Sequence, residues 1–129
     1  AADIAKYLIK KLDIATPGIH TPVRMLSGGN VQKVLLGREI EAGRDVLIVS
    51  YPVRGLDINS SYMIYNLLDE ERKRGTAIIF VGEDLDVLMA LSDRIMVMAD
   101  HRIAGITDAR TVTKDYLGSL MTDTKGQVI

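Results

Sequence analysis

Two short runs of apolar, mostly β-branched residues constrain this chain more than any other feature of its sequence. They span residues 46–49 and 76–81, and each is too short for a typical helix but long enough for a buried strand. Between them, residues 59–74 carry apolar side chains at helical spacing. A strand, a helix and a second strand in succession place the two strands in parallel. We therefore expect an α/β fold with a parallel sheet.

Four further helices and one β-hairpin are predicted around this unit from hydrophobic spacing, capping residues and turn residues. In chain order, they are helices over residues 3–13, 27–42 and 84–91, a hairpin with strands over 95–98 and 102–106, and a helix that ends near residue 121. Thr111 or Thr113 is the expected cap of this last helix. In the first helix, Ile4 and Tyr7 belong to the apolar stripe that should face the core. The tail over residues 122–129 is expected to fray.

The composition excludes several classes of function. Sixteen basic and seventeen acidic residues give a net charge of −1, whereas proteins that bind nucleic acid through bulk charge are usually strongly basic. The chain has no cysteine, which removes disulfides, thiolate catalysis and cysteine-ligated zinc. Its two histidines, His20 and His101, stand far apart and lack metal-binding spacing. We therefore expect no nucleic-acid partner and no metal site on this chain.

A serine followed by two glycines opens the predicted second helix. The segment and its neighbour are Leu26, Ser27, Gly28, Gly29, Asn30 and, further along, Gln32. Ser27 can cap the helix, and the glycines let backbone N–H groups approach a ligand closely. Because free amides and the positive end of the helix dipole coincide there, such a terminus can bind an anion. Without other motifs, however, the same segment would be interpreted as a flexible helix cap.

The order of the motifs resembles the C-terminal part of the nucleotide-binding domain of ABC transporters, a P-loop NTPase fold. Residues 26–30 look like the family's signature loop, and we name them the signature segment. Residues 54–57, which include Gly55, Leu56 and Asp57, look like its D-loop. Asn30 at the end of the signature segment points to importers of simple sugars and nucleosides, whose ATPase subunit carries two nucleotide-binding domains in one chain. The resemblance covers residues 1–121 and implies the C-terminal part of the second domain.

Three departures from the family pattern concern the catalytic groups. None of the eleven glycines is followed by lysine, so the phosphate-binding P-loop is not found in this sequence. The Walker B strand of the family ends in two acidic residues, which hold Mg²⁺ and orient the attacking water, but Ser50 and Tyr51 stand here. Glu83 stands where the family has its switch histidine, and its carboxylate would repel a phosphate. The resemblance thus implies a degenerate catalytic half with an intact signature segment.

The resemblance also implies cofactors, partners and a location. In the family, two nucleotide-binding domains enclose ATP head to tail, so the complete subunit would use ATP and Mg²⁺ and pair this half with its own first domain. Membrane permease subunits would hold it at the cytoplasmic face of the plasma membrane. Residues 1–43 would be the end of the helical subdomain and residues 44–121 part of the catalytic core. The isolated chain is expected to hydrolyse no ATP and to self-associate through uncovered apolar faces.

Two alternatives remain open at this stage. A chromosome-maintenance or DNA-repair ATPase head shares the signature loop and the fold, although it usually retains acidic Walker B residues. A non-catalytic interaction module could have kept the fold and lost the chemistry, although the intact signature segment argues against that interpretation. The sequence does not identify the transported solute, because solute choice lies in the permease and its binding protein.

Overall fold

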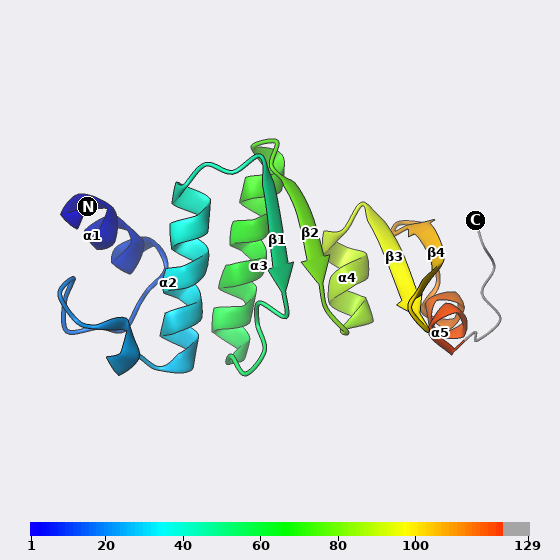
Figure 1. The fold of residues 1–129 in the computed structure, drawn as a ribbon, viewed down its shortest axis with the longest axis horizontal. Helices are drawn as coiled ribbons and strands as arrows, with labels where there is room; N and C mark the ends of the chain where they lie inside the picture. The colour runs from blue at the N-terminus through cyan, green and yellow to red at the C-terminus, as the bar shows by residue number, and fades with distance from the viewer. Residues whose placement is uncertain (123–129) are drawn as a thin grey trace. The chain divides into compact units, whose positions relative to one another are not determined.

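The chain forms two compact units, Ala1–Val81 and Gly82–Ile129, in a computed structural model that describes residues 1–122 (Figure 1). The elements in chain order are α1 (Ala2–Lys11), the 3-10 helix η1 (Val23–Met25), α2 (Gly28–Glu41), β1 (Val46–Ser50), α3 (Ile58–Lys73), β2 (Ala77–Val81), α4 (Leu85–Leu91), β3 (Arg94–Ala99), β4 (Arg102–Asp108) and α5 (Lys114–Thr122). Thr122 belongs to α5, and the rest of the tail that was expected to fray lies outside the described residues.

The first unit is built on the predicted parallel strand pair. Strands β1 and β2 run in parallel, in a register that aligns Val46 with Ala77 and Ser50 with Val81. The connecting helix α3 contacts β2 and also contacts α2, which lies beside it (Figure 1). The expected α/β arrangement with flanking helices is therefore confirmed.

Only one face of this strand pair is covered within the described part of the first unit. Leu47 and Val49 point into the core, whereas Ile48 between them is 66% exposed. The buried core residues of this unit are Leu12, Ile14, Leu36, Ile40, Leu47, Val49, Ile64, Leu67 and Leu68. The opposite face carries the exposed apolar side chains Val46, Ile48, Ile79 and Val81. We name these four residues the outer sheet face.

Helix α1 ends two residues earlier than the sequence predicts. Asp13 takes a left-handed conformation with φ of 47°, and the Ile14 N–H donates to the Ile9 carbonyl at 3.0 Å. This bond is the closing contact of a Schellman-type helix end, which usually has glycine at the left-handed position. The expectation that Ile4 and Tyr7 face the core is wrong, because they are 51% and 48% exposed. Among the described elements only α2 packs closely on α1.

Helix α2 approaches α1 at a glycine. An added Cβ on Gly37 would lie 2.7 Å from Leu12 Cδ1 and 3.0 Å from Leu8 Cδ2. Such distances are well below an ordinary carbon–carbon contact. The absence of a side chain at Gly37 is therefore what lets the two helices meet. The other end of α2 lies at Glu41, one residue before the predicted end at residue 42, and Gly43 follows with a left-handed φ of 62°.

The second unit contains the predicted hairpin. Strands β3 and β4 are antiparallel, and Asp100 and His101 in the turn both have positive φ, as a type I′ hairpin turn requires. Helix α5 packs on β3, and Thr113 accepts a bond from the Tyr116 N–H at 3.3 Å, which makes it the cap. The buried core residues are Ile95, Val97, Ala104, Ala109, Leu117 and Leu120. Within residues 1–122, no helix has the length and apolar content that crossing a bilayer demands.

Candidate functional site

Ser27 caps α2 as the sequence predicts. Its Oγ accepts a bond from the Asn30 N–H at 3.4 Å and a second bond from Asn30 Nδ2 at 2.9 Å. Ser27 itself is in extended backbone and exposed, so the helix begins at Gly28. The signature segment therefore places the first N–H groups of α2 at the surface, where the positive end of the helix dipole lies.

The two glycines of the signature segment have different surroundings. A Cβ added to Gly28 would meet no atom within 4 Å, whereas one added to Gly29 would lie 3.1 Å from Leu56 Cδ2. Gly28 thus faces open space, and Gly29 packs on a residue of the segment that resembles the D-loop. The structure therefore brings the signature segment and the D-loop-like segment into contact through Gly29 and Leu56.

Asn30 and Lys33 tie the start of α2 to the segment that follows α1. The Ala15 N–H donates to Asn30 Oδ1 at 3.0 Å, and Lys33 Nζ donates to the Asp13 carbonyl at 3.0 Å. Lys33 is buried, with 8% of its surface exposed. Its ammonium group therefore serves a local contact within the first unit. These partners of Asn30 and Lys33 were not predicted, because no local spacing signals a contact between segments this far apart in the sequence.

The end of β1 holds Ser50 and Tyr51, the two residues that the resemblance aligns with the family's acidic pair. Ser50 is the last residue of the strand and is exposed, and Tyr51 follows with a left-handed φ of 48°. The Tyr51 N–H donates to the Val81 carbonyl at 2.8 Å, which extends the pairing with β2. The Arg54 guanidinium lies 5.7 Å from the centre of the Tyr51 ring. Neither Ser50 nor Tyr51 supplies a carboxylate at this strand end.

Asp57 ends the D-loop-like segment and caps α3. Its carboxylate accepts bonds from the Ser60 N–H at 2.9 Å and the Ser60 hydroxyl at 2.7 Å. These bonds hold the pKa of the Asp57 carboxyl below its ordinary value, and the positive charge of Lys33 lowers it further. Gly55, two residues earlier, has a φ of 76°, which a residue with a side chain rarely adopts. The Asp57 carboxylate is therefore used to cap α3 in this unit.

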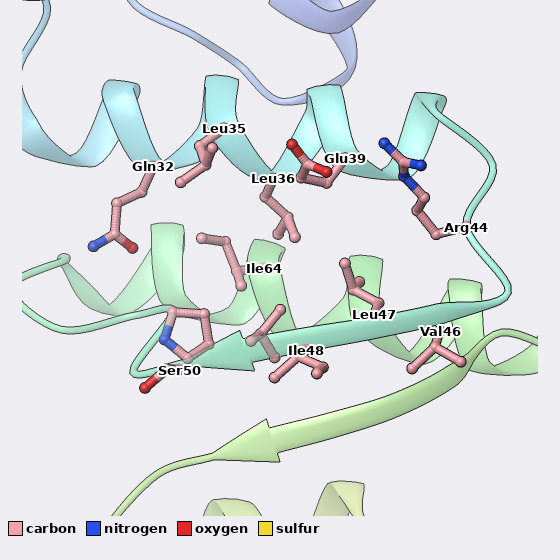
Figure 2. A pocket seen from close by; sticks show the side chains of 12 residues that line it. Gln32, Leu35, Leu36, Glu39, Arg44, Val46, Leu47, Ile48, Ser50 and Ile64 are labelled. Atoms are coloured by element: carbon pink, nitrogen blue, oxygen red, sulfur yellow. The ribbon is translucent and has the colours of Figure 1, made fainter.

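A groove of about 480 Å³ runs between α2 and β1. Figure 2 shows Gln32 and Ser50 toward one end of the groove and Arg44 toward the other. The remaining lining residues are mostly apolar: Leu35, Leu36, Val46, Leu47, Ile48, Val49, Pro52 and Ile64, together with Glu39. Two of the predicted site residues, Gln32 and Ser50, thus line one groove.

Glu83 is the one predicted site residue that belongs to the second unit. It is exposed and stands in a bend between β2 and α4. The following residue, Asp84, caps α4 by accepting bonds from the Asp86 and Val87 N–H groups. The other predicted site residues all belong to the first unit.

The groups present suit a phosphate better than a metal ion. The capped terminus of α2 offers backbone donors beside the open space at Gly28, an arrangement that favours an anion. Mg²⁺ prefers carboxylate oxygens, and β1 ends in a hydroxyl and a phenol instead. Within the described residues, no three His, Cys, Asp or Glu side chains gather closely enough to hold a metal ion.

Comparisons with known proteins find relatives among import ATP-binding proteins. It is 40% identical over 112 residues to the galactose/methyl galactoside import ATP-binding protein MglA of Clostridium tetani, with 87% of this chain and 22% of that protein covered. It is 40% identical over 117 residues to the guanosine import ATP-binding protein NupO of Bacillus subtilis, with 91% and 23% covered. For the ribose import ATP-binding protein RbsA of Bacillus subtilis, the identity is 41% over 121 residues, with 94% and 24% covered. The chain thus spans less than a quarter of each of these relatives.

Solved structures agree on the fold. A dimeric bacterial ABC transporter cassette superimposes with a TM-score of 0.73 at 21% identity, covering 85% of this chain and 47% of that one. The same cassette in a post-hydrolysis state with ADP and phosphate gives the same score. No family model matches the chain. None of the relatives named above is a chromosome-maintenance or DNA-repair protein, so that alternative is not favoured.

The resemblance predicted from the sequence is confirmed. Over most of its length the chain is a homologue of ATP-binding proteins of ABC sugar and nucleoside importers. It matches a part of each, and its fold matches about half of a solved ABC transporter cassette.

Proposed function

We propose that this chain is the C-terminal part of the second nucleotide-binding domain in an importer's ATP-binding subunit. In that subunit, the signature segment at the start of α2 contacts the γ-phosphate of an ATP molecule held mainly by the first domain. The site on this half lacks the groups for hydrolysis, because Ser50, Tyr51 and Glu83 replace the family's catalytic residues. The subunit therefore has one productive and one degenerate ATP site.

The observation that carries this proposal is the open space at Gly28. A Cβ there would meet no atom within 4 Å, although the adjacent helix terminus presents unpaired donors at its first turn. A ligand atom at the position of that Cβ would therefore meet no described atom within 4 Å. The end of β1 carries no carboxylate. This supports the proposal that this half supplies the signature segment and the first domain supplies the catalytic groups.

The proposed cofactors and partners follow from this arrangement. ATP and Mg²⁺ would bind mainly on the first domain, whose P-loop and acidic strand end would hold them. Permease subunits would bind the complete subunit and hold it at the cytoplasmic face of the membrane. The relatives' names indicate a sugar or a nucleoside as the transported solute.

The test compares charged substitutions in the complete ATP-binding subunit assembled with its permease. Gly28→Asp should lower the steady-state ATPase rate by about 10²–10³-fold, the usual cost of losing a preorganised donor contact to a developing anion. The fold tolerates the new Cβ at Gly28, and Gly18→Asp is the matched control, because Gly18 also faces open space in an exposed loop. We expect that control to keep wild-type activity.

Restoring acids at the end of β1 should have little effect. The combined change Ser50→Asp and Tyr51→Glu leaves Glu83 at the switch position, so the degenerate site stays unproductive. If Gly28→Asp hydrolysed ATP like the wild type, the signature segment would be only a helix cap and the proposal would fail.

A further inference from the structure

The side-chain amide of Asn30 has a single possible orientation. The Ala15 N–H donates to it at 3.0 Å, and a backbone N–H requires an acceptor. The carbonyl oxygen of the amide must therefore face Ala15, and the NH₂ group must face the other way. In that direction lies the Ser27 hydroxyl, 2.9 Å from Asn30 Nδ2.

This orientation determines what the Ser27 hydroxyl can do. A serine oxygen can accept two hydrogen bonds and donate one. Here it accepts one bond from Asn30 Nδ2 at 2.9 Å and a longer one from the Asn30 N–H at 3.4 Å. Both acceptor positions are thus occupied, and only the hydroxyl hydrogen remains available. Within residues 1–122, no hydrogen bond uses that hydrogen.

The start of α2 is also supported from its other side. Leu56 lies against Gly29, at 3.1 Å from the position of an added Cβ, and is partly buried against the core of the first unit. The first turn of α2 is therefore held between the Ala15 contact and the Leu56 contact. A donor in this turn does not have to reorganise before a ligand arrives, which is the condition for strong electrostatic stabilisation.

We propose that Asn30 is a positioning residue that fixes the Ser27 hydroxyl as a hydrogen-bond donor toward a phosphate oxygen of ATP. This inference rests on the proposed function, because it assumes that the signature segment meets the γ-phosphate. A phosphate oxygen accepts hydrogen bonds, so a hydroxyl that can only donate suits it, whereas a hydroxyl that presents a lone pair would oppose it.

A double-mutant cycle in the complete, assembled subunit tests the proposal. Ser27→Ala removes the hydroxyl, and Asn30→Asp keeps the size of the side chain and an acceptor for Ala15 but offers no donor to Ser27. We expect Asn30→Asp to lower kcat for ATP at least tenfold, about the size of one lost bond to a charged oxygen. In the Ser27→Ala background, the same change should alter kcat by less than about twofold, because the hydroxyl that Asn30 positions is gone. Asn30→Gln, which retains a donor, should recover part of the loss.

The outcomes separate this inference from the proposed function. If Ser27→Ala keeps wild-type kcat, the Ser27 hydroxyl does not contact ATP and the positioning role fails, whereas the proposed function is decided separately by Gly28→Asp. Ser27→Ala could lower kcat while Asn30→Asp lowers kcat by the same factor in both backgrounds. The added negative charge alone would then explain the loss, and the positioning role would be overturned while the proposed function stands. Amide exchange at Ala15 and in α2 verifies that each variant is folded.

Discussion

Replacing Gly37 by alanine tests how closely α1 and α2 must pack. In an ordinary helix, alanine is more stable than glycine by about 0.5–1 kcal/mol, because glycine loses more backbone entropy on folding. At Gly37, however, the new Cβ would stand 2.7 Å from Leu12 Cδ1. Leu12 is only 3% exposed, so its side chain has little room to move away.

The magnitude follows from these two opposing effects. Overpacking a core contact costs about 1–3 kcal/mol, and the gain in helix propensity offsets part of it. We therefore expect Gly37→Ala to reduce the local unfolding free energy by about 1–2 kcal/mol, because the helices must separate by about 1 Å to reach an ordinary contact distance.

Native-state amide exchange resolves this change by element. Protection of the α1 and α2 amides should fall by a factor of about 5–30, which corresponds to about 1–2 kcal/mol. Gly118→Ala in α5 is the matched control, because a Cβ there would meet no atom within 4 Å, and protection of α5 should rise. If Gly37→Ala instead raised protection like the control, helix packing at Gly37 would not be limiting and the reasoning would be refuted.

Three further changes have defined outcomes. Asp57→Asn keeps the cap of α3 but removes the charge. Because the folded state lowers the pKa of Asp57, the Asp57 carboxylate should stabilise the wild type relative to Asp57→Asn above about pH 4. This difference in the free energy of unfolding should disappear as the pH falls through the folded pKa, which denaturation at several pH values measures. Gly105→Ala should destabilise the second unit by about 1–3 kcal/mol, because its Cβ would stand 2.8 Å from Leu120 Cδ1; a thermal melt that matched the wild type would contradict this. The outer sheet face should make the isolated chain self-associate, and Ile48→Lys should shift its sedimentation toward the monomer; a wild type that stays monomeric at high concentration would contradict the expectation.

Local patterns were sufficient for most of the elements. The β-branched runs predicted β1 and β2, and the helical spacing between them predicted α3 and hence the parallel pairing. Ser27 identified the start of α2, because an N-cap acts on neighbouring residues only. The short helix η1 was missed, since residues 23–25 follow Pro22 in a segment that has no helical period.

Contacts between distant residues were not predictable in the same way. The apolar spacing of α1 predicts a helix correctly. It does not show that Ile4 and Tyr7 are left uncovered by the described elements. The contacts of Asn30 with Ala15 and of Gly29 with Leu56 depend on how helices and loops pack. The sequence motifs therefore predict the residues of the candidate site, whereas the bonds that support these residues are found only in the structure.

The two bonds that join α2 to residues 13–15 have a mechanical consequence. Asn30 and Lys33 stand about one turn apart on α2, and each is fixed to the backbone of that segment. Two attachment points resist rotation as well as translation, so the start of α2 cannot turn without carrying α1 along. These two bonds and the close approach at Gly37 make α1 and α2 move as one rigid body, and the signature segment lies at one end of it.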